Sequence, residues 1–384
     1  MNEAIFAAAQ PMDDDDFAAV SYLLRDATVK IVVQLDCAYF DAQLLVGTQV
    51  FPDAFNDCEP YDRLTHIFYV PQSMLETDMP LTFAALDSET DGDLCAHTFA
   101  YTPVFADEAA LLDAYDSRIT PQTVQTETVA PGVIYRHLDC TDRNGAPVHA
   151  FLLEIDPALH TIYVGTPDDG YASCGVRATV PQMIKAAVRG GQDVVAAVNA
   201  DFFDMFGDGH PSGLCVKNGR VVANADSARP FLGVQQDGTP VIASLREAPE
   251  LLPRLSQAAA GLQRILRDGA LCEWGPLEPF AYVRHPRTAA GLRPDGTILL
   301  LEVDGRIPAY SNGATLVDLA MLLRSFGASD AVNLDGGGSS VVYTKGESGF
   351  DLRTNPADLY RPTERLIREE YNCLLVVRKQ NEAK

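Results

Sequence analysis

The sequence is short of positive charge. Its 384 residues include 29 Lys and Arg against 53 Asp and Glu, which gives a formal net charge of −24. A field of that sign repels phosphate backbones and anionic membrane surfaces. We therefore expect no nucleic acid among the partners, and an anionic substrate would need its own local group of arginines.

Long apolar runs and paired cysteines are also missing. No segment approaches the roughly 20 apolar residues of a membrane-spanning helix, and the N-terminus lacks the basic and apolar regions of a signal peptide. The eight cysteines stand singly, without a Cys-x-x-Cys pair, which favours buried thiols in a reducing compartment. These absences predict a soluble, cytoplasmic protein without a membrane span, unless an export signal has been trimmed.

The length and the 47% hydrophobic content suit two domains. Apolar residues at helical spacing predict a helix over 16–27, and residues 107–118 predict another. The β-rich runs between them are residues 28–35, 42–51 and 64–70. The Thr-, Gln- and Pro-rich stretch 120–132 is either a linker or an extended entry strand. We predict a small α+β domain of unknown role over 1–119 and a second domain over 120–384.

The second domain repeats a pattern of capped helix, strand and polar end. Helices are predicted over 178–191 and 315–327, because Thr179 and Thr315 are suited to be N-caps and glycines follow the last turn. Three further strand-like runs precede them, at 133–140, 149–156 and 160–166. We expect an α+β fold of mixed sheets with packed helices.

Both helix-following strands end in Asn-x-Asp: Asn199 with Asp201, and Asn333 with Asp335. The ends of strands are where α/β architectures place binding and catalytic groups. Asn and Asp also start ordinary turns after strands, because they bond their own backbone. The occurrence of the pair, each followed by an unusual loop, favours a shared site.

The segment 331–343 runs from an apolar strand into three glycines and two serines, Gly336 to Gly338 with Ser339 and Ser340, and back to a strand. Glycines at such a density permit positive φ angles, close approach of the backbone to a ligand, or an anion-binding array of N–H groups. No lysine follows them, which excludes a Walker A loop. A tight β-hairpin is the alternative.

Two arginines stand out in this acidic chain. Arg287 lies in His-Pro-Arg-Thr with His285 and Thr288, and Arg306 ends Val-Asp-Gly-Arg after Asp304. Their planar guanidinium groups suit phosphate or carboxylate oxygens. Taken alone, Asp-Gly-Arg is more often an ordinary turn, and a lone histidine before proline carries no role.

The loop 199–222 is rich in Gly and Asp. Its Asp201, Asp204 and Asp208 offer oxygen ligands for a divalent cation such as calcium, although the spacing is not that of an EF-hand. The loop is therefore a candidate calcium site, and the alternative is a loop without metal.

The order of these motifs, N-A-D-F-F, P-S-G, R-P-F-L-G-V, H-P-R-T-A, V-D-G-R and N-L-D-G-G-G-S-S, resembles the phosphodiester glycosidase family. That family includes the lysosomal uncovering enzyme, which releases N-acetylglucosamine from mannose 6-phosphate tags, and bacterial proteins linked to exopolysaccharide. The resemblance spans about residues 125–378. It implies a hydrolase that acts on a sugar phosphodiester or related glycan.

The resemblance also implies site residues. It places these in or near the active site: Asn199, Arg287, Thr288, Asp304, Asn333, Asp335, Gly336, Gly337, Gly338 and Ser339. Asp201 stands where some members have glycine, so its role is open.

Three functions remain in view. In the first, Asp335 and Asp304 stabilise or capture an oxocarbenium-like centre, while Arg287, the glycine N–H groups and Ser339 hold the phosphate. The second is a non-catalytic glycan-binding protein in polysaccharide assembly. The third is a serine hydrolase with Ser339 or Ser340 as nucleophile and His285 as base, although the G-x-S-x-G turn of many such enzymes is absent.

Overall fold

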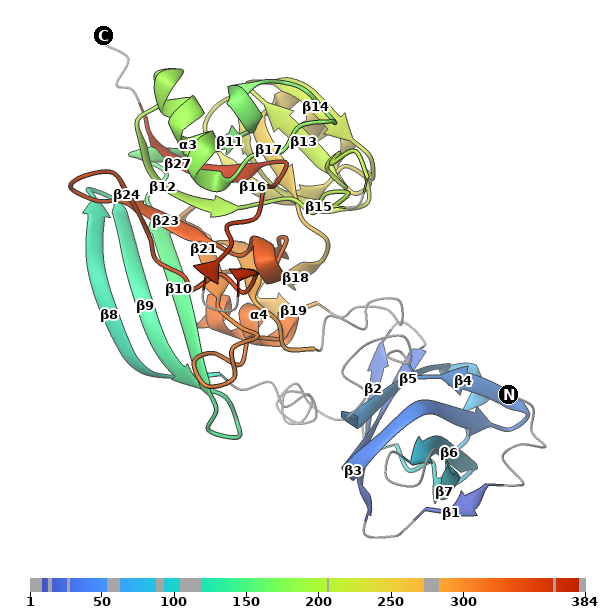
Figure 1. Ribbon diagram of the computed structural model, residues 1–384. Coiled ribbons are helices and arrows are strands. Elements are labelled where there is room, and N and C mark those ends of the chain that lie inside the picture. Colours follow the sequence, from blue (N-terminus) through green and yellow to red (C-terminus); the bar gives the residue numbers. More distant parts are fainter. Residues whose placement is uncertain are drawn as a thin grey trace. The chain divides into compact units, whose positions relative to one another are not determined.

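The structure is a computed structural model, and it describes residues 9–12, 16–25, 28–53, 63–87, 93–103, 119–205, 207–272, 283–361 and 364–379. The described residues fall into two compact units. Those up to 103 form the first unit, and those from 119 onward, Val283 excepted, form the second (Figure 1).

The first unit is a sheet of seven strands in the order β1-β7-β6-β3-β2, with β4 and β5 also paired to β3. The strands are β1 Gln10–Pro11, β2 Phe17–Arg25, β3 Thr28–Val46, β4 Gln49–Pro52, β5 Arg63–Pro71, β6 Pro80–Asp87 and β7 Leu94–Ala100, and the short 3-10 turn η2 is Gln72–Met74. The first half of β3 pairs with β2 and β5, and its second half pairs with β4 and β6. One long strand therefore joins all parts of this sheet.

The helix predicted over residues 16–27 is wrong, because Phe17–Arg25 is strand β2. Its pairing with β3 shifts register between Phe17 and Ala19, and such a shift interrupts the period-2 alternation that marks a strand. The second predicted helix, 107–118, lies outside the described residues.

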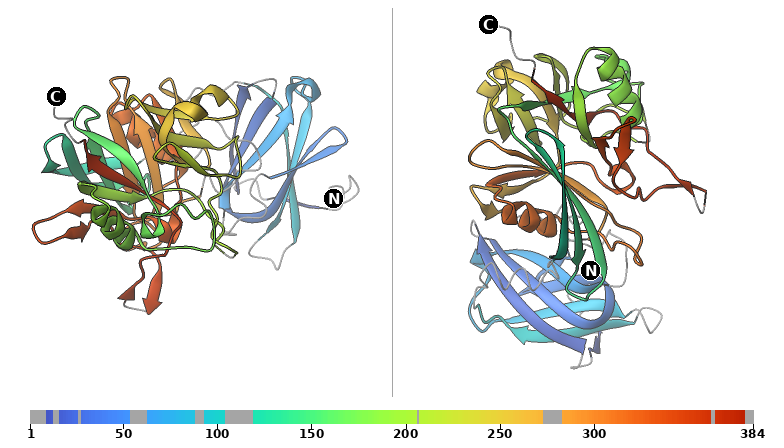
Figure 2. Two further views of the ribbon diagram at one scale, coloured as in Figure 1. Left: turned by 90° about the horizontal axis from the view of Figure 1, so that it is seen from above. Right: turned by 90° about the vertical axis from the view of Figure 1, so that its left-hand side faces the viewer.

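The second unit contains three larger sheets. An eight-stranded sheet has the order β19-β18-β22-β20-β21-β10-β9-β8, and two five-stranded sheets have the orders β11-β27-β12-β23-β24 and β14-β13-β17-β15-β16. The strands of the first sheet are β8 Thr120–Ala130, β9 Val133–Thr141, β10 Pro147–Ile155, β18 Arg264–Arg267, β19 Ala270–Leu271, β20 Arg287–Leu292, β21 Ile298–Val303 and β22 Asp330–Asn333. Figure 2 shows β8, β9 and β10 as long, curved neighbours.

The remaining strands complete the smaller sheets. They are β11 His160–Gly165, β12 Val194–Asn199, β13 Leu214–Lys217, β14 Arg220–Asn224, β15 Pro230–Gln235, β16 Pro240–Ser244, β17 Leu255–Ala260, β23 Val342–Lys345, β24 Phe350–Leu352 and β27 Cys373–Arg378, with a separate pair β25 Leu359–Arg361 and β26 Glu364–Arg365. The 3-10 turns are η3 Pro167–Asp169, η4 Pro249–Arg254 and η6 Gly337–Ser339.

The two helices predicted in this unit are confirmed as α3 Val180–Arg189 and α4 Leu316–Ser325. Thr315 caps α4 reciprocally with Asp318, through a 3.1 Å bond to the Asp318 amide and a 2.9 Å bond from the Thr315 amide to the carboxylate. Thr179 and the third helical residue form the equivalent box in α3. Local capping signals therefore located both helices correctly.

The polar stretch 120–130 is the edge strand β8, not a linker, and its side chains are exposed along almost the whole strand. The main core packs apolar residues of all three sheets together, including Phe151, Leu232 and Leu374. Strands dominate the described fold, and α3 and α4 are its two α-helices. The α+β expectation therefore holds only in part.

Among the described residues, no helix is long and apolar enough to cross a membrane. Free thiols are found at Cys95, Cys140, Cys174, Cys215, Cys272 and Cys373. Cys140, Cys215 and Cys373 of the second unit are buried, whereas Cys174 is exposed.

Candidate active site

The two Asn-x-Asp strand ends lie together although β12 and β22 belong to different sheets. The side chain of Asn199 donates from Nδ2 to the backbone oxygen of Asp335 at 2.7 Å. The amide of Asp335 in turn donates to the backbone oxygen of Ala200 at 2.8 Å. One side chain and one backbone bond thus join the ends of the two sheets.

Asn199 also holds the start of β20 and the end of the glycine loop. Its Oδ1 accepts hydrogen bonds from Thr288 Oγ1 at 2.7 Å and from the Val341 amide at 3.2 Å, and Thr288 Oγ1 lies 3.4 Å from Ser340 Oγ. Asn199, Thr288 and Ser340 are all buried. Because buried polar groups are costly unless paired, this network fixes the position of the loop; its members are supports for the site.

The glycine loop is a 3-10 turn at Gly337–Ser339, and two of its glycines are required by close neighbours. Gly337 has φ +63°, and a Cβ there would lie 3.1 to 3.4 Å from the guanidinium of Arg306. A Cβ on Gly338 would lie within 2.1 to 2.2 Å of the Asp358 carboxylate. The glycines therefore let a cation and an anion approach the backbone.

The amides of the loop are not an open anion-binding array. The Gly336 amide donates to Asp335 Oδ1 at 2.8 Å, and the Gly337 amide donates to the Pro286 oxygen at 2.8 Å. Both N–H groups thus already have partners inside the protein, which disfavours their predicted use in holding phosphate.

Asp335 is a half-buried carboxyl group at the start of this loop. Burial raises its pKa to about 6, against the opposing effects of hydrogen bonds from Ser339 and Gly336 and the charges of Arg368 and Arg306. A carboxyl group with a pKa in this range changes charge near neutral pH, which suits acid, base or nucleophilic chemistry.

Three charged residues that the sequence analysis missed complete this cluster. Arg368 donates from Nε and Nη2 to Asp358 Oδ2 at 2.9 and 2.7 Å, and its Nη1 lies 3.4 Å from Ser339 Oγ. Glu370 is buried, and burial followed by the charge of Asp335 raises its pKa well above the usual range. The sequence signal for Arg368 and Glu370 was an Arg-Glu-Glu run, residues 368–370, two residues before strand β27.

Arg287 lies at the start of β20 with 4% of its surface exposed. Burial, and then the charge of Arg306, lowers its pKa to about 9, while Asp318 and Asp335 act in the opposite direction. Its Nε donates to the Ala314 oxygen at 3.2 Å. Arg287 therefore remains charged at neutral pH close to the carboxyl group of Asp335.

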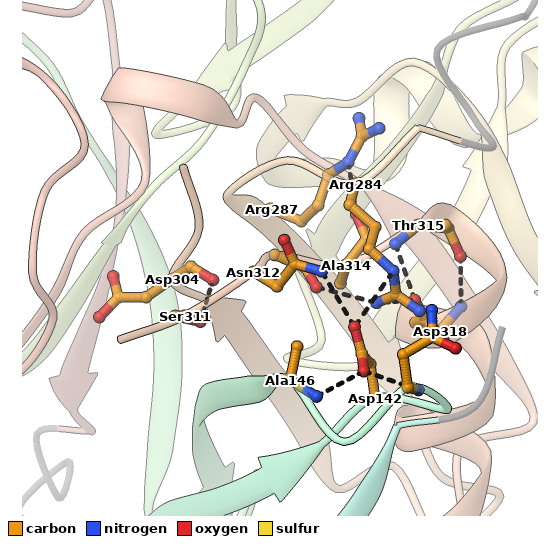
Figure 3. Close-up of polar contacts among 12 residues, drawn as sticks. Asp142, Ala146, Arg284, Arg287, Asp304, Ser311, Asn312, Ala314, Thr315 and Asp318 are labelled. Atoms are coloured by element: carbon orange, nitrogen blue, oxygen red, sulfur yellow. Dashed lines mark hydrogen bonds and ion pairs between the residues drawn. The ribbon is translucent and has the colours of Figure 1, made fainter. Parts of the chain in front are cut away.

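A buried chain of charges supports the loops beside Arg287 (Figure 3). Arg284 Nη1 lies 3.1 Å from Asp318 Oδ2, and its Nε lies 4.0 Å from Asp142 Oδ2. Asn312 donates to the same Asp142 oxygen at 2.9 Å. Three segments far apart in the sequence are thereby tied together under the site.

The carboxylate of Asp304 is engaged by residues outside the glycine loop. Its two oxygens accept from the Asn355 amide at 3.1 and 2.8 Å, and Tyr310 Oη donates to Oδ2 at 3.1 Å. Figure 3 shows its side chain pointing away from Arg287. Asp304 is not among the main groups that shift the pKa of Asp335.

Asp304 instead pairs with Glu302, which sequence reasoning missed because its strand is otherwise apolar. Both carboxyl groups are buried, and burial raises the pKa of Asp304 to about 7 and that of Glu302 well above its usual range. Asp304 itself holds the segment around Asn355, through the two bonds from the Asn355 amide.

His285 and the serines do not form a nucleophile and base. Burial lowers the pKa of His285 to about 4, and its Nδ1 has no hydrogen-bond partner in the described structure. Ser339 and Ser340 are buried and bond elsewhere in the loop network. Within the described residues no hydrogen bond joins His285 to either serine, which disfavours the serine hydrolase.

The other halves of the two motifs, Asn333 and Asp201, bond to neighbouring segments. Asn333 donates to Gln263 Oε1 at 3.1 Å. Asp201 is 2% exposed and accepts from the Gly213 amide at 3.2 Å. Both side chains are part of the packing around the site.

The predicted calcium ligands are not brought together as a set of three. Asp204 and Asp208 gather with His210 on an exposed loop, without Asp201. Asp208 Oδ1 lies 2.6 Å from His210 Nδ1, so this carboxylate already has a local partner.

Comparison with known proteins supports the family resemblance. Residues 192–371 match the family model of the phosphodiester glycosidases. The uncharacterised prophage-derived protein YomE of Bacillus subtilis is 28% identical over 65% of this chain and 35% of its own length. The mouse N-acetylglucosamine-1-phosphodiester alpha-N-acetylglucosaminidase is 30% identical over 56% of this chain and 42% of its own length. The chain thus spans well under half the length of these relatives.

Solved structures share the fold. The catalytic domain of the zebrafish N-acetylglucosamine-1-phosphodiester alpha-N-acetylglucosaminidase, auto-inhibited by its pro-peptide, superposes with a TM-score of 0.54 at 22% identity, over 68% of this chain and 89% of that one. A hypothetical protein from Synechocystis gives 0.52 at 11% identity, over 98% of this chain and 85% of its own. The family resemblance carried by the motifs is confirmed over residues 192–371, which match the family model of the phosphodiester glycosidases.

Proposed function

We propose that the second unit hydrolyses the bond between the anomeric carbon of a sugar and a phosphodiester, with N-acetylglucosamine as the first candidate sugar. The observation that carries this proposal is Asp335. Its carboxyl group has a pKa of about 6 at the meeting point of two sheets, beside Arg306 and Arg368.

Asp335 is the group suited to the anomeric carbon. Hydrolysis there passes through an oxocarbenium-like state, which an adjacent carboxylate stabilises, captures or relieves by activating water. Asp335 is ionised over the upper part of the neutral range, since its pKa lies near 6. The three bonds of Asn199, Gly336 and Ala200 hold its backbone and one carboxyl oxygen in place, which is the preorganisation such a role requires.

Arg306 is suited to the phosphate. It is exposed, unlike Arg287, and its guanidinium lies against Gly337, two residues from Asp335. Arg368 is held by Asp358 and is therefore less available. A phosphodiester is a good leaving group, so a cation that binds its oxygens contributes more than a strong general acid.

The test is sugar release from a panel of sugar 1-phosphodiesters that includes UDP-N-acetylglucosamine. Wild type is compared with Asp335→Asn and with Asp237→Asn, an exposed carboxylate in the β15–β16 turn, as matched control. We expect at least about a 10³-fold loss of kcat/KM in Asp335→Asn, which corresponds to about 4 kcal/mol, and no change in Asp237→Asn.

Each result decides between the functions. Release by wild type and the control, with loss in folded Asp335→Asn, supports the glycosidase and the assigned role. Equal release by all three proteins contradicts the role of Asp335. Glycan binding that survives in Asp335→Asn, without release by any protein, favours the glycan-binding protein instead.

A further inference from the structure

Two histidines and one aspartate of the second unit bring three metal-ligand atoms to one point. His149 Nδ1 lies 3.0 Å from His137 Nε2 and 3.0 Å from Asp139 Oδ1. The third separation, from His137 Nε2 to Asp139 Oδ1, is 3.4 Å. The side chains are 21% to 37% exposed, so a small ion can reach them.

The strand register places these side chains on one face of the eight-stranded sheet. His137 and Asp139 are two residues apart on β9, and side chains at that spacing point to the same side. His149 on β10 stands directly opposite Asp139. The sequence encodes the arrangement as His-Leu-Asp in one strand and a histidine in the next.

Neighbouring side chains hold each group in place. The ring of His137 stacks on Phe151 at 4.7 Å with an 11° interplanar angle, and the ring of His149 stacks on Tyr310 at 4.2 Å and 13°. Thr123 Oγ1 donates to Asp139 Oδ2 at 2.6 Å, which leaves Oδ1 toward the histidines. Such outer partners are typical of metal sites, where they orient the ligands.

Hydrogen bonding alone satisfies this arrangement poorly. His149 Nδ1 has two close partners, and one ring nitrogen carries at most one proton. An ion bound to His137 Nε2, His149 Nδ1 and Asp139 Oδ1 would give all three atoms a partner at once. Neutral imidazole and ionised carboxylate are the forms that bind metal.

We propose that His137, Asp139 and His149 bind one divalent transition-metal ion, with zinc as the first candidate. A circle through three points at these separations has a radius of about 1.8 Å, so one ion can lie about 2.1 Å from all three atoms, the distance that zinc prefers for nitrogen and oxygen. Two imidazoles favour such an ion over calcium or magnesium, which take oxygen ligands. Three protein ligands leave a fourth position open.

The ion would lie on the same face as the support of the candidate active site. His137 stands opposite Phe151, Phe151 opposite Glu302, and Glu302 opposite Thr288, in one row across four strands. Tyr310 stacks on His149 and donates to Asp304. An ion that fixes His149 would therefore also fix the Asp304–Glu302 pair, independently of whether the proposed glycosidase activity is correct.

The exposed group Asp204, Asp208 and His210 supplies the matched control. It offers the same kinds of ligand atom elsewhere in this unit. His210 Nδ1 stands 4.0 Å from Asp204 Oδ2, so these atoms are less closely gathered than those on β9 and β10.

The test is calorimetric titration of the full chain with zinc chloride after removal of metal by a chelator. We expect one equivalent to bind the wild type, and binding to weaken at least about 100-fold in His137→Asn with His149→Asn. The pair Asp204→Asn with His210→Asn should bind as the wild type does. Cobalt(II) in place of zinc should give a visible d–d absorption that follows the same pattern.

Folding is checked by circular dichroism, and zinc should raise the Tm of the wild type and of the control pair but not that of the double histidine variant. If the double variant does not fold, Asp139→Asn replaces it, with an expected loss of at least about tenfold. The proposal is overturned if wild type binds no zinc, if the variants at residues 137, 139 and 149 bind it undiminished, or if the control pair abolishes binding.

Discussion

The ends of β12 and β22 carry the same short motif and use it in opposite ways. In Asn199-Ala-Asp201 the asparagine binds across to the other sheet, and the aspartate is buried against Gly213. In Asn333-Leu-Asp335 the asparagine is occupied with Gln263, and the aspartate is the half-buried group beside the arginines.

The difference shows that the two motifs are complementary halves of one site. One strand end supplies the amide that holds the loop, and the other supplies the carboxyl group that the loop presents. The residue type and spacing are equal in both, so the roles come from what each side chain meets across the sheet boundary.

Among variants of the two motifs, we expect replacement of Asn199 to lower stability and activity the most. Asn199→Ala removes the bonds to Asp335, Thr288 and Val341, and leaves buried polar groups without partners. We expect about 2 to 4 kcal/mol less stability and at least about a 100-fold lower kcat/KM. Denaturant unfolding and the sugar-release assay measure the two losses.

Asn333→Ala is the matched control, because it removes the single bond to Gln263. We expect about 1 to 2 kcal/mol less stability and kcat/KM within about tenfold of wild type. Similar activity losses in the two variants would show that the ends of β12 and β22 are not specialised.

The aspartates should differ mainly in stability. Asp201→Ala leaves the buried Gly213 amide without its acceptor, so we expect a loss of about 1 to 3 kcal/mol. Asp335→Asn keeps an acceptor of the same shape for the Gly336 amide and should unfold at or above the wild-type denaturant midpoint. A stable Asp201→Ala protein would remove Asp201 from the support of the site.

The smallest expected effect is a change with pH in the stability difference between wild type and Asp335→Asn. The folded pKa of about 6 lies above the unfolded value of about 3.9. As pH rises, the carboxyl group of Asp335 therefore stays protonated to a higher pH in the folded state than in the unfolded state. Its contribution to stability is complete below about pH 4 and is lost as pH rises through about 6.

Wild type should consequently lose stability relative to Asp335→Asn as pH rises. Between pH 4 and pH 7 this relative loss should be about 1 to 2 kcal/mol, allowing for the partial exposure of the carboxyl group. Urea unfolding of both proteins from pH 4 to 8 measures this. A stability difference that stays constant over that range would contradict a raised pKa.

Helices with local caps could be predicted from the sequence, whereas features that depend on distant partners could not. Thr179 and Thr315 mark the starts of α3 and α4 within a few residues. Strand β2 was mistaken for a helix because the register shift after Phe17 breaks its alternation, and only pairing with β3 makes it a strand. The exposed edge strand β8 lacks a buried face, so no apolar pattern distinguished it from a linker.

The candidate site divides in the same way. Asn199, Arg287, Thr288 and Asp335 lie in dense motifs, and the structure brings them together. Arg368 and Glu370 lie in a segment without a motif, and only the path of the chain before β27 carries them to Asp335. The bonds that Asp304 accepts from Asn355 and Tyr310 could not be foreseen, because a motif gives the order of residues but not the direction of a side chain.

The buried thiols of the second unit can report how often its sheets open, because a buried cysteine reacts only when the structure around it opens. Burial raises the pKa of Cys140 and Cys215 to about 12, so neither is a thiolate at neutral pH in the folded state. Cys174 is exposed and can react at once with an alkylating reagent. Pulse alkylation followed by mass spectrometry therefore separates the reaction of exposed Cys174 from that of Cys140 and Cys215. The latter two report local opening of the sheets that contain β9 and β13.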